Sequence, residues 1–504
     1  MARKVSLVAG LSSLPARDRA LLQGLVGAAL VTLLIGIAFG ALTAFVRAGF
    51  IEVRPESGYR FLTLHGVTIF FYWLYFAQAS VLLAFAAVYT EGVDRVALGP
   101  AAWIGFVLML AGFAANQFGM LAGAMASWSA ISFGTVAWAG LVMVSSIAAI
   151  NAFLPAMAWT FDWREMPSDH STGWHLLFHN LHYLPLMGTV LIWYAPVREA
   201  AGIGSILGDR FSKVVFALYM IFVPPTSLYH MFLEPGLSPT VRALGSLLSL
   251  FISVPTVAVF LVIVASLDAH SRACGARGLF GWMRIIAWRE PSMAAIGMAA
   301  VNLALGGALA FVLIQEQLAK LLSDTFFVPG YFHFLTIGTV SLTLLAAFTR
   351  IIPALTGGAL RWPRLLIWLP SVVTIGVAIF GFAGIFAGFA GMPRRVLDAS
   401  YDGSAPLVWL QLSMVIGISA AIMAAALALY AAGLIGDLLV GKRGVAVQST
   451  VEPSLVAPSG DAIRQAAWAG PISIGVLVAA MYAATTIGFK IMQSLPLLGG
   501  GGAH

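Results

Sequence analysis

The chain has 504 residues, of which 60% are hydrophobic and 9% are charged, and its formal net charge is +7. This composition excludes a soluble enzyme and a disordered chain, because apolar stretches of this length and number are typical of membrane proteins. The positive excess bears on membrane orientation, so no nucleic-acid partner is expected. The single cysteine, Cys274, excludes an internal disulfide and a cysteine-ligated cluster within the chain.

Hydropathy predicts an all-α fold, a polytopic membrane helical bundle of about 12 transmembrane helices. We expect one integral-membrane domain over residues 1–504, with a polar linker near 441–465 before the last helix. The basic N-terminal stretch leads into a full-length span, so we expect the first helix to be retained. The predicted spans are 20–48, 62–90, 99–123, 129–158, 173–196, 211–233, 241–267, 292–318, 327–355, 364–390, 406–439 and 468–493.

Two basic clusters, one before the first span and one at 268–290, should both face the cytoplasm. Strict alternation of the predicted spans cannot satisfy both, because it places the 268–290 loop outside. It also places His65 and His333 at opposite membrane faces. The region 91–172 is therefore where we expect an extra crossing, a re-entrant segment or the loss of a crossing.

Two histidines stand out by their position. His65 lies just inside the second predicted span, and His333 lies just inside the ninth. A polar group is costly in the bilayer, so an intramembrane histidine is functional by default. Two neutral imidazoles on opposite faces of a porphyrin make a six-coordinate, low-spin haem, whereas two unrelated histidines would each hydrogen-bond a neighbouring helix. We predict that this pair ligates a haem iron near the outer edge of the membrane.

Around these histidines the chain resembles subunit I of the haem–copper oxidases, most closely the B-type branch. The resemblance is carried by LTLHGV at 62–67, PTSLYHMFLEPGLSPT at 225–240, RGLFGWMR at 277–284, PGYFH at 329–333 and MPRR at 392–395. It implies that His65 and His333 hold the low-spin haem and that Arg394 and Arg395 bind its propionates. A guanidinium suits a carboxylate at a dry membrane edge, and interfacial anchoring is the other role open to these arginines.

The resemblance also implies a centre where a high-spin haem and a copper reduce oxygen, and there the chain departs from the family. Tyr331 stands where the family has the histidine of the high-spin haem. Tyr229 replaces one copper histidine, while His179 and His230 occupy the other copper positions. These losses predict a degenerate centre without a second haem, although a tyrosine phenolate is a known iron ligand.

Other polar groups of that centre remain. Tyr183 lies one helical turn after His179, where the family has a tyrosine cross-linked to its copper histidine, and it is a catalytic candidate only in an oxidase. His175, His179 and His182 share one face of the fifth predicted span and, with His230, offer a set of ligands for copper or zinc. The alternative is a remnant site that holds water and no metal.

The predicted proton route is incomplete. The B-type branch conducts protons along tyrosine, serine and threonine side chains. This chain keeps Tyr194 and Thr256 of that line, but Val190 and Val259 replace two polar members. Because a hydrocarbon side chain cannot pass a proton, we expect this route to be broken.

The sequence therefore favours a membrane-embedded electron-transfer subunit of a respiratory complex with one low-spin haem. The chain has no CxxCH motif for covalent attachment, so we expect haem b, although haem A would fit as well. The alternative is an active terminal oxidase that takes electrons from cytochrome c and reduces O2 to water at an altered haem–copper site. A nitric-oxide reductase is less favoured because the fifth span lacks a glutamate. A haem-free structural subunit would not need the histidines and arginines that the chain retains.

The expected partners follow from the resemblance. They are the lipid bilayer, other respiratory-complex subunits that include an electron donor, and either cytochrome c or quinol. The expected location is a bacterial or archaeal cytoplasmic membrane, which the chain crosses many times.

Overall fold

The computed structural model describes residues 7–89, 130–160, 183–197, 208–223, 239–310, 321–394, 403–440 and 460–494, with the single residues 163, 165, 318, 396 and 401. Within these ranges the chain is helical apart from short connections, and it has no strand beyond one isolated β-bridge between Thr325 and Pro393. The chain divides into two compact units. The first unit comprises Met1–Gly24, Gln78–Gly275 and Thr450–Ala467, and the second comprises Leu25–Ala77, Ala276–Ser449 and Trp468–His504.

The first unit holds fewer of the described helices than the second unit does. They are α1 (Leu7–Ser12), α7 (Ala130–Thr160), a helix over Tyr183–Val197, α9 (Gly208–Phe222) and α11 (Pro239–Ala273).

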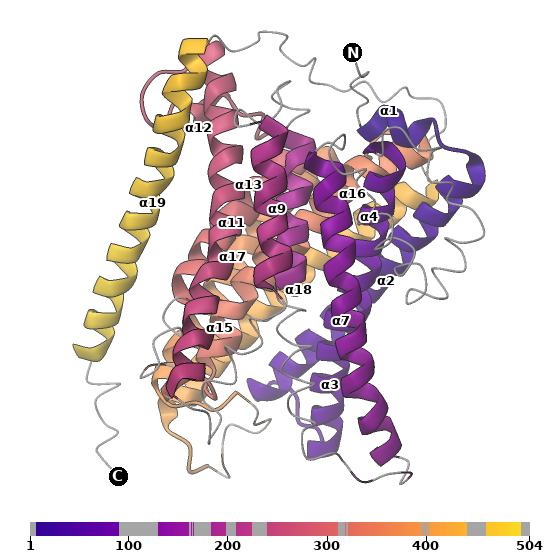
Figure 1. The fold of residues 1–504 in the computed structure, drawn as a ribbon. Helices are drawn as coiled ribbons and strands as arrows, with labels where there is room; N and C mark the ends of the chain where they lie inside the picture. Colours follow the sequence, from indigo (N-terminus) through magenta and orange to yellow (C-terminus); the bar gives the residue numbers. More distant parts are fainter. Residues whose placement is uncertain are drawn as a thin grey trace. The chain divides into compact units, whose positions relative to one another are not determined.

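The second unit holds more helices, many of which carry their labels in Figure 1. Those wholly inside it are α3 (Pro55–Val67), η1 (Thr68–Trp73), α12 (Trp282–Ile285), α13 (Pro291–Ala310), α15 (Phe327–His333), η6 (Phe334–Ser341), α16 (Leu342–Thr356), α17 (Pro363–Phe389) and α18 (Leu407–Val440). Three helices run from one unit into the other, namely α2 (Ala16–Arg47), α4 (Leu74–Tyr89) and α19 (Gly460–Ser494).

Six of the described helices are long and apolar enough to cross a membrane. They are Ala16–Arg47, Val254–Ala273, Pro291–Ala310, Phe327–Thr356, Pro363–Phe389 and Leu407–Val440. Their outer faces are apolar as well: Trp368, Ile375 and Ile418 are 70%, 59% and 51% exposed. A helix that is apolar all round is stable only when lipid or protein covers it, so the chain is an integral membrane protein.

The predicted spans coincide with helices wherever the structure describes them. The count of about twelve helices stays a prediction, because the span 99–123 and parts of its neighbours lie outside the described residues. In the region 91–172, where a miscounted crossing was expected, residues 130–160 form the single helix α7 and nearly all the rest lies outside the described residues. The linker prediction differs at one end, since residues 460–465 already belong to α19.

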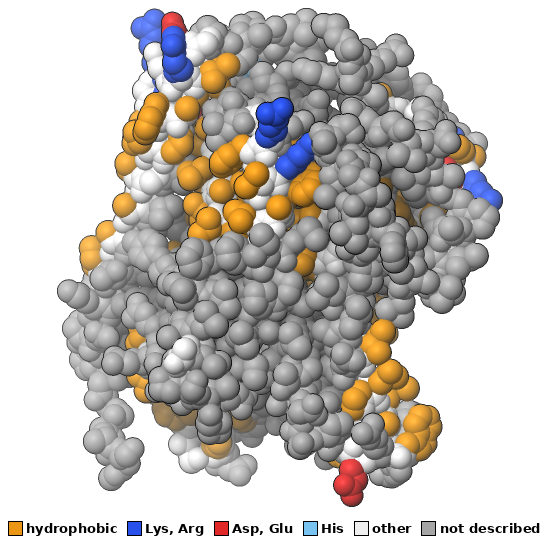
Figure 2. All heavy atoms as spheres, viewed as in Figure 1, with side chains coloured by type: hydrophobic (Ala, Val, Ile, Leu, Met, Phe, Trp, Pro, Cys, Tyr) orange, Lys and Arg blue, Asp and Glu red, His pale blue; other side chains and the backbone are white. Residues whose placement is uncertain are grey.

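The last helix shows how charge and apolar surface are distributed along one element. Its N-terminal end carries an ion pair between Asp461 and Arg464, and further along Trp468, Ile472 and Val476 are exposed. Figure 2 shows the charged side chains gathered at that end of α19 and hydrophobic ones along the described part below it. In the second unit, Trp282 Nε1 donates a hydrogen bond to Ser473 Oγ at 3.3 Å.

Glycines let α15 lie directly against α17. A Cβ at Gly330 would lie 2.8 Å from the Gly381 carbonyl oxygen, and one at Gly384 would lie 2.9 Å from Gly330 Cα. Small residues allow this backbone approach in membranes, where van der Waals packing drives helix association. The helix that carries His333 is therefore fixed against a second long helix by its backbone.

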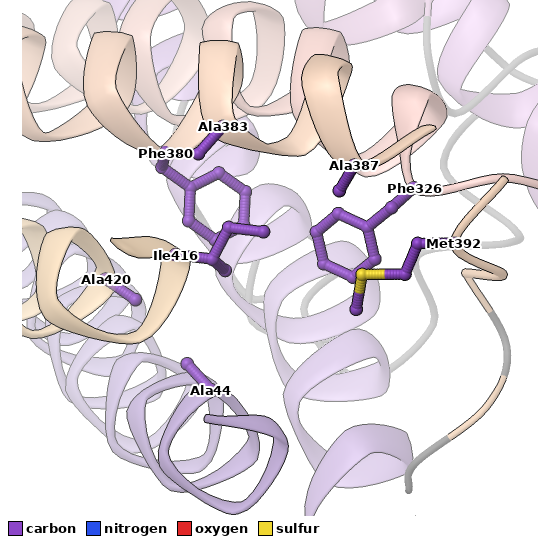
Figure 3. Close-up of a cluster of buried hydrophobic side chains, with 8 residues drawn as sticks. All are labelled: Ala44, Phe326, Phe380, Ala383, Ala387, Met392, Ile416 and Ala420. Atoms are coloured by element: carbon purple, nitrogen blue, oxygen red, sulfur yellow. The ribbon is translucent and has the colours of Figure 1, made fainter. Parts of the chain in front are cut away.

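A cluster of buried apolar side chains completes this packing (Figure 3). Its members come from α2, α17 and α18, together with one residue just before α15 and one just after α17: Ala44, Phe326, Phe380, Ala383, Ala387, Met392, Ile416 and Ala420. In Figure 3 the Phe326 ring lies beside the Met392 side chain, and Phe380 lies beside Ile416. The cluster joins α17, α18 and the residue before α15 to the C-terminal part of α2, and Phe380 of the cluster contacts the His333 ring.

Candidate haem site

His65 lies on α3, and its ring is held against α2. Its Nδ1 is 2.8 Å from the carbonyl oxygen of Gly36. Because a carbonyl only accepts, Nδ1 must carry the hydrogen, and the lone pair is on Nε2. A Cβ at Gly40 would lie 2.7 Å from the same Nδ1, so only glycine there leaves room for the ring.

His333 is the last residue of α15, and it is held in the same way. Its Nδ1 is 2.7 Å from the carbonyl oxygen of Pro329, one turn earlier in the same helix. Its ring lies on the Phe380 ring, with a centroid separation of 4.1 Å and an interplanar angle of 35°. As with His65, the hydrogen is on Nδ1 and the lone pair is on Nε2.

The two imidazoles thus have the same tautomer and belong to the same unit. They are close enough for a charge on one ring to act on the other. A histidine that donates its Nδ1 hydrogen to a backbone carbonyl is the usual form of a metal-ligating imidazole, because this bond fixes the ring and raises the basicity of Nε2. The donor set therefore fits an axial pair for haem iron.

Arg394 marks one edge of this site. Its Nη2 lies 3.3 Å from Asp324 Oδ1, and its backbone nitrogen donates to the Asp324 carbonyl at 3.0 Å. The side chain is close enough to Tyr331 for its charge to act on the phenol. Asp324 is largely exposed whereas Arg394 is partly buried, so the guanidinium pairs with an anionic group at the surface.

Arg47 is a neighbouring cation that the sequence analysis missed. Its Nη2 donates to the Arg394 carbonyl at 2.8 Å, and its guanidinium lies over the Phe326 ring at 5.2 Å from the centroid. These contacts tie the end of α2 to the segment that carries Arg394. The sequence shows an arginine at the end of the first span, and such a position by itself indicates only an ordinary membrane-interface anchor.

Tyr331 and His333 share α15 but lie on different sides of it. Residues two positions apart in an α-helix are separated by about 200° around its axis, so these side chains point in nearly opposite directions. The Tyr331 ring contacts Phe327 and Phe332, with centroid separations of 5.9 and 6.1 Å. The phenol therefore does not lie on the face of His333.

Several predicted site residues lie outside the described residues. They are Arg395, His175, His179, His182, Tyr229 and His230. The copper site and the second propionate-binding arginine therefore stay predictions. Tyr183 is the first residue of the described helix Tyr183–Val197 and is partly buried. Among the residues that the structure does describe, no group of three or more His, Cys, Asp or Glu side chains is placed to hold a metal ion.

The polar residues of the predicted proton route form two hydrogen-bonded pairs in the first unit. The Tyr194 hydroxyl donates to Ser212 Oγ at 3.0 Å, and the Tyr219 hydroxyl is 2.6 Å from Thr256 Oγ1. Val190 and Val259 are fully buried. Ser212 and Tyr219 were missed by the sequence analysis; they lie seven residues, about two turns, apart on α9, a spacing that marks a shared helix face.

The fold thus defines a polytopic helical membrane protein with two partly buried, hydrogen-bonded histidines in its second unit. Residues 136–423, more than half of the chain, match the family model described as Cytochrome C and Quinol oxidase polypeptide I. The chain therefore belongs to the subunit I family of haem–copper oxidases. The family predicted from the sequence motifs is confirmed.

Individual relatives agree with this assignment. The chain is 29% identical over 327 residues to cytochrome c oxidase subunit 1 of Thermus thermophilus, covering 63% of this chain and 54% of that protein. It is 38% identical over 110 residues to cytochrome c oxidase subunit 1 of Albinaria turrita, covering 22% and 54%. It is 28% identical over 215 residues to cytochrome c oxidase polypeptide 1 of Halobacterium salinarum, covering 40% and 33%. The chain thus spans about half the length of these relatives, or less.

A solved structure shares the fold over almost the whole chain. It is a cryo-EM structure of a heme-copper terminal oxidase dimer, with a TM-score of 0.69 at 18% identity, and the match covers 93% of this chain and 92% of that one. This likeness shows the fold alone.

Proposed function

We propose that this chain is a membrane-embedded electron-transfer subunit of a respiratory complex, with one low-spin haem held between His65 and His333. The observation that carries the proposal is the matched state of the two imidazoles: each donates its Nδ1 hydrogen to a backbone carbonyl and keeps Nε2 for a metal. No CxxCH motif is present to attach a haem covalently, so we expect haem b, with haem A as the alternative.

The surroundings suit such a group. Phe380 covers one side of His333, and Gly40 leaves room for His65, so both rings are held before any iron is bound. When bound, the haem supplies reversible one-electron chemistry. The protein would hold the haem through His65 and His333, both rings being fixed by backbone hydrogen bonds, and with two imidazoles bound to the iron no site would be left for oxygen.

The cations at the edge are assigned to the propionates. Arg394 is partly buried near the site, and Arg395 follows it in the MPRR segment. A guanidinium binds a carboxylate through charge-assisted hydrogen bonds. We expect Arg394 to turn from the exposed Asp324 towards a propionate, while Arg47 holds the backbone of Arg394 in place.

Two differences argue against oxygen reduction and support a degenerate centre in a chain that resembles the B-type branch. Tyr331 and Tyr229 replace two metal-ligating histidines, so a second haem and a copper would both lack ligands. Val190 and Val259, which replace two polar members of the predicted route, are fully buried and cannot pass a proton.

The second candidate is an active terminal oxidase with an altered haem–copper site. It is favoured by the relatives, which are cytochrome c oxidase subunits, and by the retained Tyr183. In this alternative His179, His182 and His230 bind copper and Tyr183 takes part in catalysis.

Either function requires other proteins. We expect the chain to assemble with further subunits of a respiratory complex, one of which delivers electrons from cytochrome c or quinol. The expected host membrane is the cytoplasmic membrane of a bacterium or archaeon.

Optical spectra of the purified chain, oxidised and reduced, with and without carbon monoxide, separate these functions when combined with haem and copper analysis. The electron carrier predicts one haem per chain, a low-spin spectrum and no response to carbon monoxide. A component sensitive to carbon monoxide, together with copper, would instead establish the oxidase. A chain purified from its native membrane without haem would overturn both.

A further inference from the structure

Both predicted haem histidines stand next to a π-helical segment. His333 ends α15 and directly precedes η6, Phe334–Ser341. His65 lies three residues before η1, Thr68–Trp73. π-helical turns are rare and occur mostly at functional sites. Because a π turn contains about one residue more than an α turn, it rotates the residues after it relative to those before it.

The ends of the two π segments are joined. Trp73 Nε1 donates a hydrogen bond to Ser341 Oγ at 3.1 Å. The Ser341 hydroxyl in turn donates to the Thr336 carbonyl, five residues earlier in its own π segment, at 3.0 Å. Trp73 and Ser341 are 0% and 3% exposed, so no water competes for these bonds. Trp73 also packs edge-on against Phe348 at a centroid separation of 6.1 Å.

The spacing is the same on both helices. Trp73 follows His65 by 73 − 65 = 8 residues, and Ser341 follows His333 by 341 − 333 = 8 residues. η1 makes up six of the eight residues that follow His65, and η6 makes up all eight that follow His333. Because a π turn is wider than an α turn, each π segment shifts the second residue around the helix axis relative to its histidine. In a continuous α-helix the same residue would be displaced by about 80° around the axis.

The η6 segment is also fixed by neighbouring helices of the second unit. Asn302 on α13 donates from Nδ2 to Thr374 Oγ1 on α17 at 2.9 Å, and its side-chain amide lies against the bare Cα of Gly338. Within η6, Thr339 Oγ1 donates to the Phe334 carbonyl at 2.9 Å. With η6 anchored in this way, the hydrogen bond to Ser341 transmits its position to η1.

We propose that Trp73 and Ser341 are a positioning pair that joins the two π-helical segments and sets the orientation of the His65 and His333 rings relative to each other. The inference rests on the proposed haem function of these histidines. The pair touches neither imidazole in the structure; it acts through the two helix backbones. Loss of the bond lets the ring planes rotate, which alters the magnetic anisotropy and the reduction potential of a bis-histidine haem.

The test is a double-mutant cycle in the full-length chain, with Trp73→Phe, Ser341→Ala and the double variant. We expect each single variant to shift the low-spin g-values and the midpoint potential in the same direction. The double variant should shift them no further than either single variant, because both remove one shared bond. The rate of haem loss should rise about tenfold in each, as for other residues that orient a metal ligand. Ser341→Thr, which keeps the hydroxyl, should restore the g-values.

Trp138→Phe is the matched control. Trp138 is buried and its Nε1 donates to Gln78 Oε1 at 3.0 Å, but it lies in the first unit. It should lower the unfolding temperature and leave the g-values unchanged. If Trp73→Phe fails to fold, the g-values of Ser341→Ala and Ser341→Thr are compared instead, since these two variants differ in whether the hydroxyl is kept. Unchanged g-values in Ser341→Ala, or additive shifts in the double variant, overturn the positioning pair while the haem proposal stands. A wild-type chain without a low-spin haem overturns both.

Discussion

The histidine site of the second unit keeps both side chains that a bis-histidine haem needs, whereas the chain lacks several of the residues that an oxygen-reducing centre needs. A bis-histidine haem needs two imidazoles, each fixed by one backbone carbonyl, and the second unit supplies both. An oxygen-reducing centre needs ligands from several helices and an unbroken proton route. In the described part of the first unit, Tyr194 bonds to Ser212 and Tyr219 bonds to Thr256, while Val190 and Val259 stand where the predicted route needs polar side chains. A site that needs only two ligands, each fixed by its own hydrogen bond, tolerates substitutions that would disable a site built from many residues.

The strongest way to break this comparison is to remove a ligand. His65→Ala or His333→Ala should abolish the low-spin haem, because one imidazole cannot make the six-coordinate complex. Haem content and the optical spectrum of the purified variants measure this. His270→Ala is the control, since His270 is a buried histidine of the first unit and its loss should leave the haem in place. A low-spin haem that persists in His65→Ala would refute the axial pair.

The next effect comes from crowding one ring. Gly40→Ala places a methyl group 2.7 Å from His65 Nδ1, so the ring must move and lose its bond to Gly36. We expect haem affinity to fall by about 10- to 100-fold, the usual cost of disturbing the support of a metal ligand. Gly24→Ala on the same helix is the control, because its added methyl would meet nothing within 4 Å. Equal haem affinity in the two variants would argue against a role for Gly40.

A smaller effect should follow from removing a cation at the site edge. Arg394→Gln removes positive charge that favours the reduced haem, so the midpoint potential should fall. The expected drop is up to about 60 mV, the value of a tenfold change for a one-electron couple. Arg47→Gln should lower it less, because Arg47 acts on the Arg394 backbone. A redox titration measures both, with the exposed Arg464→Gln as the control. A rise in potential would contradict the propionate assignment.

The smallest effect is expected in the first unit. Tyr219→Phe removes the bond to Thr256 Oγ1 and should cost about 1 kcal/mol of unfolding free energy, the usual net value of one hydrogen bond. Electron transfer through the haem should be unchanged, because an electron carrier needs no proton route. Thermal unfolding and haem reduction kinetics measure the two quantities. If the substitution stopped oxygen consumption instead, the chain would be a working oxidase.

The histidines could be predicted from the sequence because a polar residue inside a bilayer-length apolar stretch is informative by itself. The span ends were predicted well where the apolar run ends abruptly: α18 covers Leu407–Val440 and the prediction was 406–439. The start of α19 was not, because Gly460–Ala467 is polar and hydropathy does not register a helix supported by a pair such as Asp461 and Arg464.

Other parts of the site depend on tertiary approach and could not be predicted. The glycine carbonyl that fixes His65 comes from a helix about thirty residues earlier, and glycines are common in membrane helices. The π segments also escape detection, because η6 and α16 form one apolar window with α15. The role of Arg47 follows only from its hydrogen bond to Arg394, which lies hundreds of residues away in the sequence.

Near-infrared magnetic circular dichroism of the oxidised, purified chain tests the central claim most directly, because it identifies the axial ligand pair of a ferric haem. The account predicts the charge-transfer band of a bis-histidine haem, from one haem per chain, and its loss in His333→Ala. A spectrum with any other ligand pair, or that of a high-spin haem alone, would contradict it.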